Sequence, residues 1–270
     1  KGIIGVGDIT LYQTYFSSIV AQIASIVTLL PIIAKGLESV ESIGDVLCAN
    51  DIEDNRRKKK VVDLKGEITF QDVSFTYKGD EKPVLSHLNF KIQPGETVAF
   101  AGGSGSGKTT ILNLAIGFLK ADSGQILIDG MDIGSRHKEM IGYMPDFFGV
   151  YDKLRVKEYM AFFASIYSLD REKTEQKTEQ LLSLVKLTEK KEAYVDSLSR
   201  GMKQRLCLAR CMIHDPKLLI LDEPASGLDP RARYEFKEII RQLRKQGRTV
   251  MISSHILSEL SEMCTDICII

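Results

Sequence analysis

The chain has 270 residues, of which 44% are hydrophobic and 27% charged, a composition typical of a globular protein with one large domain and an appendage. Its 36 basic and 36 acidic residues cancel, which argues against a nucleic acid as the partner. The five cysteines lack the spacing of a disulfide framework, which excludes the small disulfide-rich secreted proteins and indicates a reducing compartment.

The N-terminal region contains one long uncharged segment. Residues 9–34 hold no charged side chain and exceed the roughly 20 residues that cross a bilayer as a helix. Pro31 is expected to kink this helix, and its scattered Gln, Ser and Thr residues suit a helix packed in a bundle or lining a cavity. We therefore predict a transmembrane helix; the alternative is a buried or interfacial helix of a soluble protein.

Beyond Lys35 the apolar residues keep a helical period while charges appear, so the helix is expected to continue into water until about residue 50. Residues 51–64 form a polar linker. Its basic cluster at 56–60 favours the cytoplasmic side of a cell membrane, although a solvated linker explains the cluster as well. Because the chain does not begin with Met, we expect a piece of a longer protein in which residues 1–50 end a transmembrane domain.

From about residue 65 onward, short apolar runs alternate with segments of helical period. Residues 66–77 form two alternating runs offset by a slip at Gln71 and Asp72, and residues 84–92 supply a partner strand. Later runs are expected to be strands covered on both faces, at 217–222, 249–254 and 265–270. The pattern predicts an α/β fold with a mostly parallel sheet flanked by helices and an antiparallel portion at its start.

A glycine-rich segment lies between an apolar run at 97–101 and an apolar helical segment. It matches the pattern G-x-x-x-x-G-K-[ST] of a phosphate-binding loop, in the strand–loop–helix context that this pattern requires. Glycines let the backbone wrap phosphate oxygens, and the helix N-terminus adds a positive partial charge. Lys108 is expected to reach the β- and γ-phosphates, Thr109 to ligate Mg²⁺ and Thr110 to lie at the α-phosphate. The loop consists of Gly102, Gly103, Ser104, Gly105, Ser106, Gly107, Lys108 and Thr109.

Two adjacent acids end a later apolar run, and consecutive side chains of a strand point in different directions. Asp222 is expected to hold Mg²⁺, which leaves Glu223 free to polarise the attacking water as general base. His255, directly after the run at 249–254, is expected to reach the γ-phosphate. The alternative is that the two acids only cap a strand.

Five motifs in order make residues 65–270 resemble the ATP-binding cassette (ABC) ATPases. They are the Walker A loop at 102–109, the signature LSRGM at 198–202, the Walker B strand ending in Asp222 and Glu223, the D-loop at 226–229 and the switch His255. The resemblance implies an ABC-type P-loop fold with a small helical subdomain, C-terminally truncated. It also implies ATP and Mg²⁺ as ligands, with Tyr77 stacked on adenine.

The same resemblance implies a partner. In such ATPases the signature helix contacts the γ-phosphate held by a second ABC ATPase domain, so that two ATP molecules are sandwiched head to tail. Ser199 and the N–H of Gly201 would donate to that phosphate, aided by the helix dipole. ATP binding and hydrolysis would then close and open the pair and power transport through a transmembrane domain in the same chain or a partner subunit.

Three residues depart from the family's usual pattern. Arg200 replaces a commoner glycine and Met202 the usual glutamine, while Ser199 and Gly201 remain. Asp146 stands where the family usually has a glutamine near Mg²⁺. A carboxylate still ligates the metal but adds a negative charge near the phosphates.

The leading hypothesis is therefore an exporter ATPase at the cytoplasmic face of a cell membrane. Residues 1 to about 120 resemble exporters that fuse membrane and ATPase domains, whereas residues from about 140 resemble ATPases encoded apart from their membrane subunit, so the cargo stays unidentified. One alternative is a soluble ABC-type ATPase acting on nucleic acid or ribosomes, which the balanced charge disfavours. Another is a nucleotide-binding regulator without turnover, which Glu223 disfavours.

Overall fold

The computed structural model describes residues 5–48, 64–132, 140–146, 149, 153–256, 260 and 263–270. The chain divides into two compact units, Lys1–Arg56 and Arg57–Ile270. The linker predicted at 51–64 lies outside the described residues except for Leu64. The domain boundaries drawn from the sequence therefore stay a prediction.

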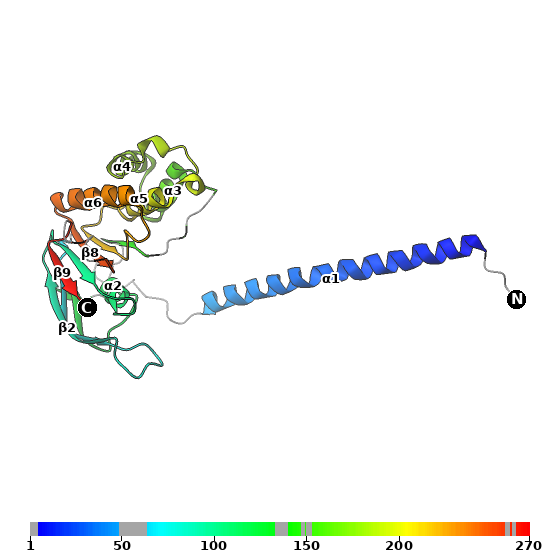
Figure 1. The fold of residues 1–270 in the computed structure, drawn as a ribbon, viewed down its shortest axis with the longest axis horizontal. Coiled ribbons are helices and arrows are strands. Elements are labelled where there is room, and N and C mark those ends of the chain that lie inside the picture. The colour runs from blue at the N-terminus through cyan, green and yellow to red at the C-terminus, as the bar shows by residue number, and fades with distance from the viewer. Residues whose placement is uncertain are drawn as a thin grey trace. The chain divides into compact units, whose positions relative to one another are not determined.

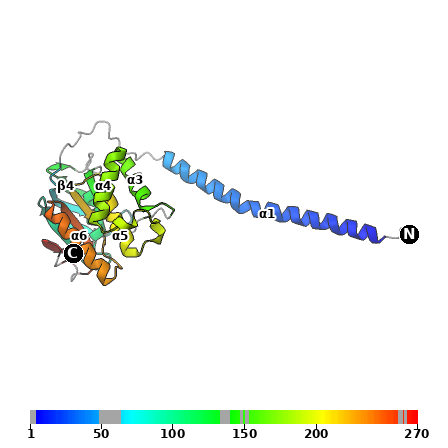
Figure 2. The ribbon, with the colours of Figure 1, turned by 90° about the horizontal axis from the view of Figure 1, so that it is seen from above.

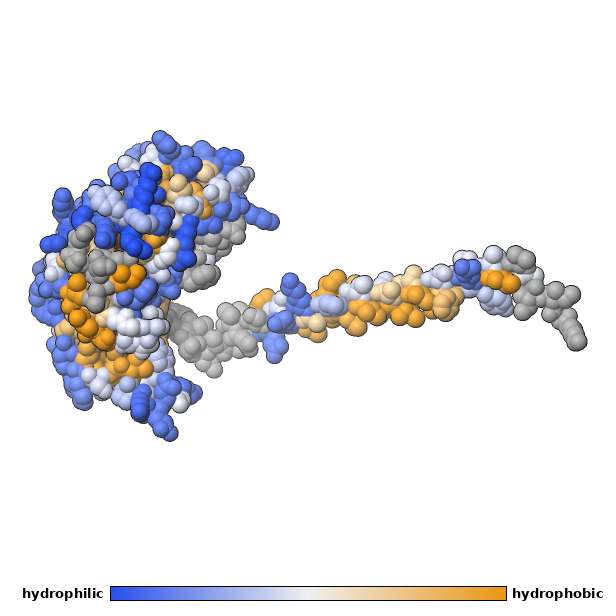
Figure 3. All heavy atoms as spheres, in the orientation of Figure 1, coloured by the Kyte–Doolittle hydropathy of each residue, from blue (hydrophilic) through white to orange (hydrophobic). Residues whose placement is uncertain are grey.

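The first unit contains the long helix α1 (Val6–Cys48), with Pro31 inside it (Figure 1). Its stretch Ile9–Glu41 is long and apolar enough to cross a membrane, by length and composition, and none of its most apolar window is buried. Figure 3 shows apolar residues along much of this helix. The helix itself satisfies several of its hydroxyl groups, since Thr14 Oγ1 donates to the carbonyl of Thr10 at 2.9 Å.

The second unit is built on two sheets. An antiparallel sheet, in the order β2-β1-β4-β5, consists of β1 (Ile68–Phe75), β2 (Leu85–Ile92), β4 (Ser123–Ile128) and β5 (Met131–Asp132). A parallel sheet, in the order β6-β7-β8-β3-β9, consists of β3 (Thr97–Ala101), β6 (Ile141–Met144), β7 (Leu218–Leu221), β8 (Thr249–Ser254) and β9 (Asp266–Ile269). The predicted α/β fold with its antiparallel portion is confirmed.

Helices surround the parallel sheet. They are α2 (Lys108–Ile116), α3 (Val156–Ile166), α4 (Arg171–Leu184), α5 (Arg200–Cys211) and α6 (Pro230–Lys245), with 3₁₀ turns at Thr188–Lys190 and Val195–Ser197. Figure 1 shows α3 to α6 gathered at one end of this unit and β2 at the other, and Figure 2 shows the same helices from above. The segment between β6 and β7 thus supplies the small helical subdomain.

Alternate side chains of the parallel strands enter two separate cores, because successive residues of a strand point to opposite faces. Phe100 and Ile220 pack with α2 and the antiparallel sheet, whereas Leu221 and Ile252 pack with the helical side. Strands covered on both faces read as continuous apolar runs, which made β7 and β8 predictable. The same prediction is wrong for β9, since among the described strands β9 lies at the edge of the sheet beside β3 and its Ile269 is 77% exposed.

Candidate active site

The loop between β3 and α2 depends on its glycines. Gly105 and Gly107 have φ angles of 81° and 94°, in the left-handed region that glycine adopts without strain. A Cβ on Gly102 would lie only 2.6 Å from the hydroxyl oxygen of Ser106. The loop therefore brings its backbone into a tight curl at the N-terminus of α2, where N–H groups and the helix dipole favour an anion.

Lys108, the first residue of α2, is a buried cation. Its Nζ donates to the carbonyl oxygens of Gly102 at 2.8 Å and Gly103 at 2.7 Å, and the residue is 7% exposed. In the part of the chain that the structure describes, no carboxylate pairs with this ammonium group. Because a buried charge without a counterion is costly, the loop and Lys108 together fit a phosphate group.

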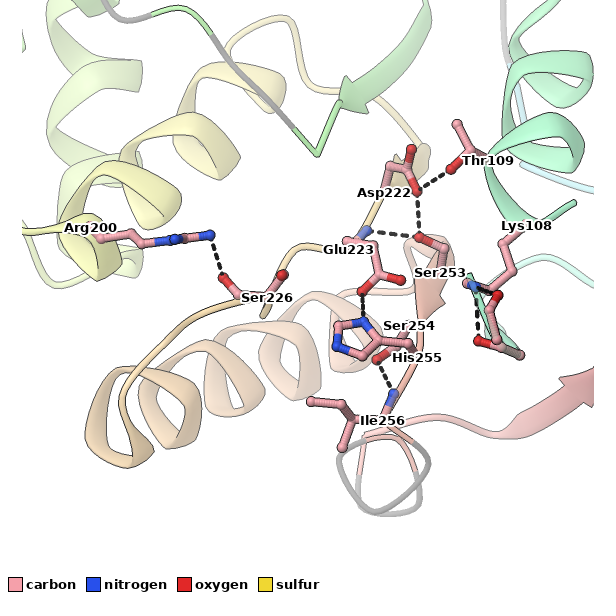
Figure 4. A network of polar contacts seen from close by, with 12 residues as sticks. Lys108, Thr109, Arg200, Asp222, Glu223, Ser226, Ser253, Ser254, His255 and Ile256 are labelled. Carbon is pink, nitrogen blue, oxygen red and sulfur yellow. Dashed lines mark hydrogen bonds and ion pairs between the residues drawn. The ribbon is translucent and has the colours of Figure 1, made fainter. Parts of the chain in front are cut away.

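Asp222 is a buried anion beside the same helix. Its Oδ1 accepts hydrogen bonds from Ser253 Oγ at 2.6 Å and Thr109 Oγ1 at 3.2 Å, as Figure 4 shows, and the residue is 3% exposed. Among the described residues no cation pairs with it. Burial and this carboxylate raise the pKa of Tyr143 to about 12, so the phenol stays protonated.

The oxygens of Thr109 and Asp222 are of the kind that Mg²⁺ prefers. Among the described residues, no group of three or more His, Cys, Asp or Glu side chains could hold a metal ion by itself. Mg²⁺ usually takes one or two carboxylates and completes its shell with water and substrate phosphates.

Glu223 points away from Asp222, although the two are adjacent. Its backbone has a φ of 45°, which non-glycine residues rarely adopt, and its N–H donates to Ser253 Oγ at 2.7 Å. Its Oε2 lies 2.7 Å from Nδ1 of His255 (Figure 4). Because an ionised carboxylate only accepts hydrogen bonds, Nδ1 is the donor in this contact.

These side chains meet at one pocket of about 520 Å³. The residues predicted from sequence that line it are Tyr77, Ser104, Gly105, Ser106, Gly107, Lys108, Thr109, Thr110, Asp146, Glu223 and His255. Three other predicted residues, Gly102, Gly103 and Asp222, support the lining residues through the hydrogen bonds described above. Tyr77 is 40% exposed, and its hydroxyl lies 3.0 Å from Thr110 Oγ1.

Ser199 and Gly201 do not line this pocket. Ser199 is the N-cap of α5, where its Oγ accepts a hydrogen bond from the N–H of Met202 at 3.3 Å. A Cβ on Gly201 would lie 2.6 Å from Cβ of Ala232, so glycine allows α5 and α6 to approach closely. The structure therefore does not bring these two residues to the phosphate loop of their own chain.

Sequence reasoning missed Ser253, which holds both the Asp222 carboxylate and the Glu223 N–H and is fully buried. The available signal was a hydroxyl side chain inside an apolar strand, two residues before His255. Val84, which no motif contains, and Ser226, the first residue of the D-loop, also line the pocket.

Residues 85–226 match the family model described as ABC transporter. Nod factor export ATP-binding protein I of Rhizobium etli is 36% identical over 206 residues, which are 75% of this chain and 65% of that protein. The protein of the same name from Burkholderia pseudomallei is 37% identical over 206 residues, covering 75% of this chain and 67% of that protein. The chain thus spans about two thirds of the length of these curated relatives.

Among solved structures, cbiO1 from Clostridium perfringens, described as part of the ABC transporter complex cbiONQ, is similar with a TM-score of 0.68 and 28% identity. That similarity covers 77% of this chain and 85% of cbiO1.

Proposed function

Since the chain belongs to the ABC transporter family, we propose that it is the ATP-binding part of a transporter and that its ATP hydrolysis powers transport across a membrane. One observation carries the proposal. The site holds a buried cation, Lys108, and a buried anion, Asp222, and neither has a counterion among the described residues. A magnesium nucleotide supplies both counterions, phosphate oxygens for the ammonium group and Mg²⁺ for the carboxylate.

Thr109 and Asp222 would hold Mg²⁺, and Asp146, which lines the same pocket, would add a third oxygen. The ion would neutralise negative charge on the β- and γ-phosphates. Tyr77 lines the same pocket beside Thr110, and its ring would stack on an adenine base.

In hydrolysis, Glu223 acts as the general base. A water oxygen bonds to the γ-phosphorus, the bond from that phosphorus to the ADP oxygen breaks, and the water proton passes to the Glu223 carboxylate. His255 orients Glu223 through its Nδ1–H group, and its Nε2 would donate to a γ-phosphate oxygen when the ring carries a proton on both nitrogens. Lys108 stabilises the charge on the phosphate oxygens.

Ser199 and Gly201 lie outside the pocket of their own chain, so we assign their phosphate contacts to the nucleotide of a second ABC ATPase domain. The N-terminus of α5 carries the positive end of a helix dipole, which favours an anion at that position. The active unit is then a head-to-tail pair, formed with a second copy or with a related domain.

The helix α1 would belong to a transmembrane domain, with the ATPase unit on the cytoplasmic face, where ATP is available. The alternative of a soluble ATPase acting on nucleic acid or ribosomes is not favoured, because the similar proteins are transporter components.

The substitution Glu223→Gln tests the proposal. It keeps the size of the side chain and removes the proton acceptor, so Mg-ATP hydrolysis should fall at least about 100-fold while the ATP dissociation constant changes little. On the purified chain in detergent, phosphate release measures the hydrolysis rate and binding of a fluorescent nucleotide measures the dissociation constant. The control Glu175→Gln alters an exposed carboxylate of α4 and should hydrolyse ATP normally. Equal phosphate release by Glu223→Gln and the unaltered chain would remove Glu223 from the mechanism.

A further inference from the structure

Arg200, the residue that departs from the family's commoner glycine, contacts the segment after β7. Its Nη2 donates to the carbonyl oxygen of Ser226 at 3.2 Å (Figure 4). The guanidinium also covers Gly227, where a Cβ would lie 2.6 Å from Cζ of Arg200 and 2.7 Å from Nη2. Gly227 has a φ of 65°, so glycine there meets both a backbone and a space requirement.

The contacted turn belongs to the segment that carries the proposed general base. The N–H of Ser226 donates to the carbonyl of Glu223 at 3.0 Å, and Ser226 itself lines the nucleotide pocket. Further along, the Asp229 side chain accepts from the N–H of Ala232 and caps α6. The segment is thus fixed to α6 at its end and to β8 at its start, through Ser253, while Arg200 holds its middle.

The other end of the Arg200 contact is the first turn of α5. Arg200 follows the N-cap Ser199 directly, so the guanidinium and the Ser199 hydroxyl leave adjacent residues. We propose that Arg200 is a positioning residue that fastens the first turn of α5 to the Ser226–Gly227 turn, so that a phosphate bound at Ser199 also sets the position of Glu223 and Ser226. This inference rests on the proposed function, because it assumes a nucleotide at each of the two places.

A planar guanidinium suits this role, because it donates in a fixed direction and lies flat against a glycine. The contact crosses from one motif to another, 26 residues apart in sequence, and is therefore not a local feature of α5. The guanidinium does not line the nucleotide pocket of its own chain, which separates positioning from direct catalysis.

Steady-state ATP hydrolysis by the purified chain tests the inference. Arg200→Ala should lower kcat about tenfold and leave KM for ATP within about twofold, because one charge-assisted hydrogen bond to the active segment is lost while the phosphate loop is intact. Arg200→Lys keeps a donor and should recover kcat to within about threefold of the unaltered chain. Lys203→Ala, which removes the same charge one turn further along α5, should stay within about twofold.

A kcat for Arg200→Ala within twofold of an active unaltered chain would overturn the inference, as would an equal loss in Lys203→Ala, which would assign the effect to charge alone. Failure of the proposed function has a different signature, namely no Mg-ATP hydrolysis by the unaltered chain.

A double-mutant cycle tests the contact without relying on activity. Gly227→Ala pushes a methyl group into the guanidinium in the unaltered chain, but only adds backbone strain when residue 200 is already alanine. Gly227→Ala should therefore increase the equilibrium constant for unfolding, measured in urea, by a factor at least about twofold smaller in the Arg200→Ala background than in the unaltered chain. Equal changes in both backgrounds would show that the contact is absent.

Discussion

The tasks proposed for Glu223 and Asp222 differ although the residues are adjacent, because the positive φ of Glu223 turns its side chain away from Asp222. The positive φ of Glu223 costs about 1 kcal/mol or more, and the Ser253 hydroxyl compensates by binding the Glu223 N–H. The same hydroxyl donates to Asp222, so one serine fixes both the carboxylate proposed to bind Mg²⁺ and the proposed general base. The strain at Glu223 thus lies at the residue that is proposed to direct the attacking water.

Asp146 gives a prediction at this scale. It places a third carboxylate at the pocket that Glu223 lines and that Asp222 supports. Asp146→Gln keeps an oxygen ligand and removes one negative charge near the phosphates, so kcat should stay the same or rise. The rate of phosphate release at saturating Mg²⁺ and ATP measures this kcat. A collapse of turnover in Asp146→Gln would show that the carboxylate charge is required.

Most of the residues at the site could be predicted from sequence, because phosphate and Mg²⁺ binding constrain residue type and spacing within short segments. Lys108, Thr109 and Glu223 are of this kind. The partners of Ser253 and of Arg200 were not predictable, since these contacts depend on β7 lying beside β8 and on Arg200 reaching the Ser226 turn. Such contacts join segments about 30 residues apart and leave no local pattern.

At the scale of elements, the slip predicted at Gln71 and Asp72 is present as a bulge in β1. The register with β2 shifts between Phe70 and Val73, and Asp72 has a φ of 53°. The alternation of apolar residues revealed the bulge because one inserted residue reverses the faces. Coverage of a strand by other elements is not encoded locally, which explains the wrong prediction for β9.

His214, in the turn after α5, makes the stability of the helical subdomain depend on pH. Its ring stacks on Tyr167 with centroids 4.0 Å apart, and burial lowers the pKa of His214 to about 4. The unfolded chain takes up this proton near pH 6.5, so the stabilisation is complete above that pH and is lost as the pH falls toward 4.

Between pH 7.5 and pH 5.0, this group should lower the free energy of unfolding by about 2 kcal/mol. His214→Phe keeps the stack on Tyr167 and lacks the proton site. Its free energy of unfolding should therefore fall by about 2 kcal/mol less than that of the unaltered chain between the two pH values. Urea unfolding in detergent at the two pH values compares the proteins. The same pH dependence in both would show that His214 is not the group responsible.

At the scale of the whole molecule, the order of the five motifs predicted the family, and the match of residues 85–226 to the ABC transporter family model confirms it. The apolar segment predicted the helix α1, but its composition alone does not decide between a membrane helix and a helix packed in protein.

Extraction from membranes decides between these alternatives. The chain should stay with the membrane pellet after alkaline carbonate treatment. Ile19→Lys combined with Ile26→Lys places two charges near the middle of α1, at about 2.5 to 3.5 kcal/mol each, and should release the chain. The control Ser39→Lys adds a charge at the polar end of the helix and should leave it in the pellet. Release of the unaltered chain would contradict a membrane-spanning α1.

We propose that two ABC ATPase domains clamp the nucleotides that each holds at Lys108 and Asp222. Light scattering tests this clamp by measuring the molar mass of the Glu223→Gln protein in detergent, with and without saturating Mg-ATP. Mg-ATP should double the protein mass, and adding Ser199→Arg, which blocks the N-terminus of α5, should prevent the doubling. A protein mass of one chain under saturating Mg-ATP, with nucleotide bound, would contradict it.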